Sequence, residues 1–127
     1  YPMTCRSALK NLEIIERENL VENSRITGEY LHEKLLELKE KYDVIIDVRG
    51  RGLLQGIEIE GNSRDDKFDL GQKFYETMLK NGLITELESR KNLENVVVVM
   101  HPALITSREN VDEAVGIIDK SLEGCLK

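Results

Sequence analysis

The segment whose residues could most directly do chemistry is DVRGRGLLQGIEI, at positions 47–59. Two arginines stand among closely spaced glycines, and an apolar run follows them. Glycine-rich loops can cradle phosphates, and arginine side chains bind phosphates and carboxylates. Glycines also let two strands turn without a steric clash. We therefore considered a phosphate-binding loop, a basic nucleic-acid contact and a bend between strands.

The spacing of the glycines argues against a phosphate loop. A P-loop requires GxxxxGK[ST], which the sequence lacks, and a dinucleotide loop requires GxGxxG at the start of a helix. Gly50, Gly52 and Gly56 are instead spaced GxGxxxG, and residues 53–60 have the pattern of a strand.

Acidic neighbours argue against a nucleic-acid contact, since Asp47 precedes the arginines and Glu58 follows them. The bend is then the best interpretation. We predict that Gly50 and Gly52 allow it, and that Arg49 and Arg51 project from it to grip carbonyls or carboxylates in a structural role.

The composition agrees with one globular domain that does not bind nucleic acid. The chain has 127 residues and a formal charge of −6, with 40% hydrophobic and 33% charged residues. Cys5 and Cys125 have no metal-type or CxxC spacing, and two reduced thiols in a cytoplasmic protein is the expected state, with a disulfide as the alternative. No apolar run reaches the ~20 residues that span a bilayer. Because the chain begins at Tyr1 rather than Met, we expect a piece of a longer polypeptide.

Hydrophobic periodicity predicts alternating helical and strand segments in the order ααββαββα. The expected helices cover residues 4–18, 20–42, 68–79 and a last segment that Thr106 or Ser107 caps; the expected strands cover residues 44–48, 53–60, 83–87 and 96–100. This order predicts an α+β fold with a small, mostly antiparallel sheet and helices packed on one face.

Three local expectations follow from the same patterns. Alternation of Ile57 and Ile59 with glutamates predicts a strand with one wet face. The unbroken run Val96–Met100 predicts a strand that is covered on both sides. Residues 61–66 are polar and predict a loop.

Five ordered segments resemble the small C-terminal domain of class III pyridoxal-phosphate aminotransferases, the group with the acetylornithine, ornithine and 4-aminobutyrate enzymes. DVRGRGLLQGIEI is similar to the family's "vRGxGLmxGiEl", YPMTCRSAL to "NPlacaaAL" and LEIIERENL to "LevIeeenL". NGLI is similar to "xxGvL", and VMHPALIT to "RlxPPLiit". The likeness extends over nearly the whole chain.

The resemblance implies that residues 1–127 are the small domain of a fold-type I enzyme, covering the active-site cleft. Such enzymes are homodimers that move an amino group between an amino acid, possibly an omega-amino acid such as 4-aminobutyrate, and a 2-oxo acid. The lysine that binds pyridoxal phosphate lies in the family's large domain, upstream of this chain. We therefore expect no catalytic residue and no metal site here, and an inactive isolated chain. No nucleic-acid or membrane partner is expected.

The chain departs from the family pattern at the residue that often binds the substrate carboxylate. Val99 stands in place of that arginine, so either another arginine binds the carboxylate or the substrate differs. His101 follows Val97 and Val99 at period two and could reach the vacated place, or it only ends the strand. Pro102 is expected to keep a rigid turn, although Ala103 replaces the family's second proline.

Two other functions stay open. A stand-alone, non-catalytic α+β ligand-binding or regulatory module is the alternative from another class. An aminomutase or racemase sharing this small domain is the alternative within the fold. These residues do not identify the amino donor or acceptor.

Overall fold

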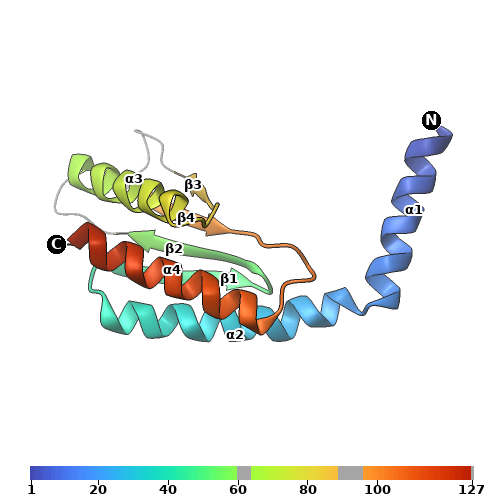
Figure 1. Ribbon diagram of the computed structural model, residues 1–127, viewed down its shortest axis with the longest axis horizontal. Helices are drawn as coiled ribbons and strands as arrows, with labels where there is room; N and C mark the ends of the chain where they lie inside the picture. Colours follow the sequence, from blue (N-terminus) through green and yellow to red (C-terminus); the bar gives the residue numbers. More distant parts are fainter. Residues whose placement is uncertain (60–63, 89–95, 127) are drawn as a thin grey trace.

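The computed structural model describes residues 1–59, 64–88 and 96–126, and within these the side chains of residues 64–69 are not described (Figure 1). The helices are α1 (Pro2–Arg17), α2 (Leu20–Lys41), α3 (Arg64–Lys80) and α4 (Arg108–Leu126). The strands are β1 (Ile45–Arg51), β2 (Leu54–Ile59), β3 (Glu86–Glu88) and β4 (Val96–Met100). The predicted element order and α+β class are confirmed.

The four strands form one sheet in the order β1-β2-β4-β3, and every neighbouring pair is antiparallel. The β1–β2 hairpin turns at Gly52 and Leu53, because Arg51 pairs with Leu54. The predicted bend is therefore present, but it lies later than expected, and Arg49 and Arg51 belong to β1 rather than to the turn.

One face of the sheet is covered by helices. Figure 1 shows α2 and α3 over the strands with α4 between them, and α4 contacts both helices. The core beneath them is made of fully buried apolar side chains from helices and strands, among them Leu35, Ile57, Phe74, Val98 and Ile118. Ser107 caps α4 as expected, since its hydroxyl accepts a hydrogen bond from the Asn110 amide at 3.4 Å.

The other face of the sheet corrects two expectations. Glu58 in β2 is buried, at 6% exposure, so the alternation did not mark a wet face. Val97 and Val99 in β4 are half-buried while their neighbours are buried, so the apolar run is fully covered on one side only. Residues 64–66 of the expected loop 61–66 are helical, because α3 begins at Arg64, and residues 61–63 lie outside the described ranges. Aspartate is favourable near a helix N-terminus, so polarity alone did not indicate a loop.

A close approach of two backbones fixes the hairpin turn to α2. A Cβ placed on Gly28 of α2 would lie 2.1 Å from the carbonyl carbon of Gly52. Gly52 has a φ of +55°, and the amide of the following Leu53 donates to the Ser24 hydroxyl at 3.4 Å. Helix α2 therefore accepts a glycine in its interior, which costs about 0.5–1 kcal/mol of helix stability relative to alanine, because any side chain would displace the turn.

Helix α1 stands apart from this body. It leaves α2 at Asn19, which has left-handed dihedrals (φ 50°, ψ 42°), and it points away from the sheet (Figure 1). None of its residues is buried, and Leu9 and Leu12 on its apolar stripe are 61% and 57% exposed. None of the described helices has the length and apolarity needed to cross a membrane.

Polar contacts join α2 to α4 at both ends of their interface. The Tyr30 hydroxyl donates to Asp112 Oδ1 at 2.7 Å. Asp119 accepts from Lys41 Nζ at 2.7 Å and from the Tyr42 hydroxyl at 2.7 Å. The pKa of the Asp119 carboxyl is held below its usual value, mainly by the hydrogen bond from Lys41 and secondly by the hydrogen bond from Tyr42.

Substituting Gly28→Ala should destabilise the fold by roughly 1–3 kcal/mol, the range for steric overpacking of a packed interior. Urea unfolding of the variant and wild type measures the change. Gly116→Ala is the matched control in α4, because a Cβ there meets nothing within 4 Å; it should raise the free energy of unfolding by up to ~1 kcal/mol. Equal losses in the two variants would contradict the close approach.

Stability should fall in acid partly through Asp119. Because the folded state lowers the pKa of this carboxyl, its contribution is present above the unfolded value of about 4 and is lost as pH falls through the folded value. Asp119→Asn should therefore be less stable than wild type from pH 5 to 7, and the difference should shrink below about pH 4. Thermal unfolding across this range tests it, with Asp43→Asn at an exposed turn as control. A difference that is unchanged at pH 3 would contradict the assignment.

Candidate functional site

The two residues predicted to approach a substrate lie at the end of β4 but face different surroundings. Val99 pairs with Gly56 of β2 and with Glu86 of β3, and it lies on the half-buried face of the sheet. His101 lies just beyond the strand, where Pro102 has no N–H to continue the ladder. Because His101 lies beyond the last residue of β4, the shared strand face stays a prediction; His101 contacts Glu86, which is the cross-strand partner of Val99.

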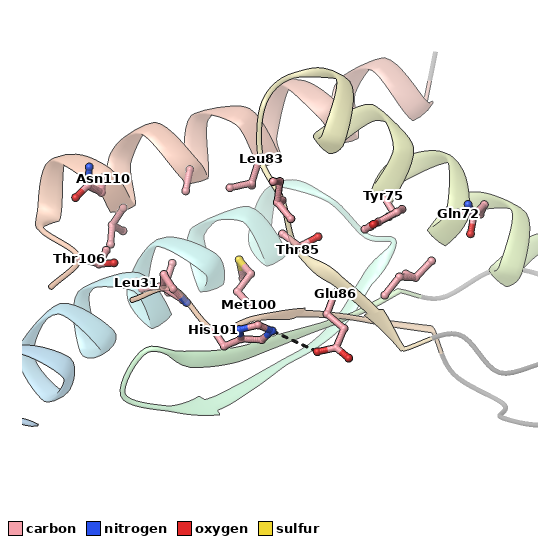
Figure 2. A pocket seen from close by; sticks show the side chains of 15 residues that line it. Leu31, Gln72, Tyr75, Leu83, Thr85, Glu86, Met100, His101, Thr106 and Asn110 are labelled. Atoms are coloured by element: carbon pink, nitrogen blue, oxygen red, sulfur yellow. Dashed lines mark hydrogen bonds and ion pairs between the residues drawn. The ribbon is translucent and has the colours of Figure 1, made fainter. Parts of the chain in front are cut away.

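His101 lines a cavity of about 860 Å³ between α3, α4, β3 and the segment after β4 (Figure 2). Its interior is mainly apolar, with Leu31, Leu83, Met100, Val111 and Ala114 contributing to the walls. Val99 is not among the lining residues. The sequence did not indicate this cavity, because its walls come from five separate segments of the chain.

Polar side chains reach the cavity from several elements: Gln72 and Tyr75 from α3, Thr85 and Glu86 at β3, His101 and Thr106 after β4, and Asn110 from α4. His101 Nε2 lies 3.3 Å from Glu86 Oε2, and these side chains are 62% and 55% exposed (Figure 2). The Thr85 hydroxyl oxygen is buried and has no hydrogen-bond partner within the described part of the chain. No lysine, arginine or cysteine lines the cavity among the described residues. The lining offers groups that can bind a ligand, and it lacks a nucleophile with an adjacent base.

The arginine segment forms an ion-pair cluster on the uncovered face of the sheet. The Arg49 guanidinium donates to Glu58 and, at 2.8 Å, to Asp47 Oδ2. The hydrogen bond from Arg49 lowers the pKa of Asp47, and the bond to Glu58 is the main cause of the raised pKa of Arg49. Arg49 thus neutralises a buried carboxylate from the adjacent strand, a non-local pairing that the sequence could not specify.

The two glycines of this segment serve different purposes. Gly52 adopts the positive φ of the turn, whereas Gly50 lies in β1, where a Cβ would come within 2.2 Å of the Leu54 carbonyl oxygen. Gln55 fixes the turn further: its Nε2 donates to the Gly52 carbonyl at 2.7 Å, and its Oε1 lies 2.9 Å from His32 Nδ1. Arg51 is exposed, and its side chain forms no hydrogen bond or ion pair with the residues that the structure describes.

Four of the described lysines have surroundings that do not suit a Schiff base with a cofactor. Such a lysine needs a lowered pKa, from burial or from a cationic neighbour. Lys34 and Lys41 instead have raised pKa values, because each donates to a carboxylate, of Glu37 and Asp119 respectively. Lys10 pairs with Glu13 at 2.8 Å, and Lys73 donates to the Cys125 carbonyl at 3.1 Å.

Metal ligands are also not gathered in the described ranges: no three His, Cys, Asp or Glu side chains there converge on a point where an ion could bind. Cys5 is exposed and Cys125 is buried, and neither forms a disulfide. The described residues therefore present a ligand-sized cavity and a charged sheet face.

Comparison with known proteins identifies what the chain resembles. The family model for class-III aminotransferases matches residues 1–122. A taurine–pyruvate aminotransferase of Bilophila wadsworthia is 40% identical over 120 residues, which are 91% of this chain and 26% of that protein. An alanine/serine racemase of Pyrococcus horikoshii is 36% identical over 126 residues, which are 98% of this chain and 26% of that protein.

A solved structure shows the same arrangement. An aminotransferase of Bacillus anthracis superposes with a TM-score of 0.89 at 32% sequence identity, over 98% of this chain and 28% of that one. The chain therefore spans about a quarter of the length of the relatives it matches.

Replacing Arg49 should destabilise the fold, because Glu58 would be left buried without its charged donor. Arg49→Ala should lower the free energy of unfolding by roughly 1–3 kcal/mol, and adding Glu58→Gln should restore part of the loss. Arg51→Ala is the control, with a change within about 0.5 kcal/mol as for other exposed positions. Chemical denaturation measures all four proteins. Equal melting temperatures for Arg49→Ala and wild type would contradict the structural role.

Proposed function

Because the chain belongs to the class-III aminotransferase family, we propose that residues 1–127 are the C-terminal small domain of a longer pyridoxal-phosphate-dependent aminotransferase. The full enzyme would transfer an amino group from an amino acid, including omega-amino acids such as 4-aminobutyrate, to a 2-oxo acid. The chain's share of its relatives, about a quarter, supports a role as one domain of a larger enzyme.

The uncovered face of the sheet is the observation that carries the proposal. Three helices cover one face, whereas the other exposes Leu54 by 57% and leaves Val97 and Val99 half-buried. An apolar strand with one half-open side is typical of a surface that another element covers. In our proposal this face, together with the apolar stripe of α1, packs against the large domain and closes one side of the cleft.

The lysine that binds the cofactor would then come from the large domain. Lys10, Lys34 and Lys41 pair with carboxylates, and Lys73 donates to a carbonyl, so we expect no catalytic activity from the isolated chain. The cofactor would supply the electron sink for amino transfer. This chain would form one wall of the cleft and would exclude water from that side.

Substrate recognition by this domain would differ from that of members with an arginine at the position of Val99. Valine has no donor, so about 1.5–3 kcal/mol of charged hydrogen bonding to a carboxylate is not available from this residue. His101 is paired with Glu86 at the cavity mouth. We infer that an arginine elsewhere binds the carboxylate, or that the substrate is recognised through another group.

A racemase is the second candidate within the family. The similarity to an alanine/serine racemase at 36% identity favours it specifically. An activity panel on the longer protein separates the two, because racemisation needs no amino acceptor. A non-catalytic ligand-binding or regulatory module is the alternative from another class of function. For the aminotransferase, we propose that the full-length protein is a homodimer located in the cytoplasm.

The isolated chain should not form a specific adduct with pyridoxal phosphate. Borohydride reduction followed by peptide mass analysis should find no lysine labelled above the level in the urea-unfolded chain, which serves as the control for exposed lysines. The longer polypeptide encoded with its upstream region should give one specific adduct and amino transfer. A stoichiometric adduct on the folded 127-residue chain would refute the proposal. An upstream region without a cofactor-binding lysine would favour the non-catalytic module.

A further inference from the structure

The cavity beside β3 has the size and lining of a ligand site, and the proposed amino transfer does not use it. Its volume of about 860 Å³ falls in the range of small-molecule pockets, roughly 300–1,000 Å³. Leucine, methionine, valine and alanine side chains line much of the interior, and polar side chains lie on several sides of it: Gln72 and Tyr75, Thr106 and Asn110, and Thr85, Glu86 and His101 (Figure 2). An apolar interior with a few polar groups suits a compact organic molecule with one polar end.

The Glu86 carboxylate at the mouth of the cavity determines which polar group a ligand can place there. Glu86 is the one carboxylate among the described lining residues, and no lysine or arginine lines the cavity with it. The neighbouring His101 occupies one oxygen of Glu86 and leaves that side chain 55% exposed. A carboxylate or phosphate would meet a like charge here without a compensating cation, whereas an ammonium group would meet an acceptor.

Thr85 adds an acceptor on the wall of the cavity. Its hydroxyl oxygen is buried and has no partner in the described ranges, although the residue lines the cavity. Rotation about χ1 exchanges the hydroxyl with the methyl group of a threonine. The Thr85 hydroxyl forms no hydrogen bond in its present rotamer within the described ranges. Turning it towards the N–H group of a ligand would therefore break no existing hydrogen bond.

We propose that this cavity binds a small organic amine, with its apolar body against Leu83, Met100 and Ala114 and its ammonium group at Glu86. The binding requires neither pyridoxal phosphate nor another domain. The inference is thus separate from the proposed function, and a failure of one leaves the other intact.

Three phenylalkyl probes, of which the amine and the alcohol have equal size, test the charge preference on the 127-residue chain. 2-Phenylethylamine should bind saturably in a calorimetric titration at low ionic strength, with amide chemical shifts changing at residues 83–87, 100–101 and 110–114. 2-Phenylethanol should bind about tenfold more weakly, and 3-phenylpropanoate more weakly still, as expected for one charged hydrogen bond at a partly exposed site.

Variants locate the binding in the cavity. Glu86→Gln should reduce amine affinity about tenfold, to that of the alcohol, and Thr85→Val should reduce it about fivefold. Ala114→Phe should fill the cavity and remove binding of all three probes. Glu113→Gln is the matched control: it removes an exposed carboxylate from α4 outside the lining, and affinity should change less than about twofold.

Equal affinity for the amine and the alcohol in wild type would overturn the proposal, as would a preference for the amine that survives Glu86→Gln. Undiminished binding to a folded Ala114→Phe chain would also overturn it. If Ala114→Phe does not fold, the exposed Glu86→Gln substitution decides the question.

Discussion

The contact between the backbones of Gly28 and Gly52 sets where the sheet sits on its helices. It brings the hairpin turn within 2.1 Å of the place where a Cβ on α2 would stand. Ser24 lies one helical turn before Gly28 and His32 one turn after it, and both form polar contacts with the hairpin. Helix α2 therefore presents one small residue between two polar ones along the face that meets the turn. This arrangement fixes the register of β1 and β2 against the helix as well as their distance from it.

That placement determines what each face of the sheet presents. Ile57 faces the helices and is fully buried, so its neighbour Glu58 must face the other way. Glu58 is nevertheless shielded from water, and Arg49 across the hairpin neutralises it. The uncovered face thus combines a compensated charge pair with the apolar side chains of β4. Such a mixture suits an interface that forms between domains of one chain, which is more polar than a core.

Local patterns predicted most of the fold. The element order, the antiparallel sheet, the cap at Ser107 and the turn near Gly52 all depend on residues close together in the sequence, where periodicity and backbone preferences act. The errors occurred where burial depends on distant partners. Alternation predicted an exposed Glu58, because the contact with Arg49 arises only when β1 pairs with β2. The apolar run of β4 did not indicate that the side chains on one face of the strand would be only half-buried.

The candidate site was predicted less well for the same reason. Val99 and His101 were correctly assigned to a strand and its end, but of the two only His101 lines the cavity. Glu86 and Thr85 were not singled out, because isolated polar residues in a short edge strand carry no motif. Their relation to the cavity depends on α3 and α4, which are contributed by segments on either side of them in the sequence.

The backbone conformation at Asn19 sets the direction in which helix α1 leaves the globular body. Two residues, Glu18 and Asn19, separate α1 from α2. Asn19 has left-handed dihedrals, and asparagine is one of the few residues that adopt this conformation readily. The 16 residues of α1 extend about 24 Å at 1.5 Å per residue. A change of about 10° at this pivot would therefore displace Tyr1 by about 4 Å. The backbone torsions of Glu18 and Asn19 thus set the position of Tyr1 relative to the globular body.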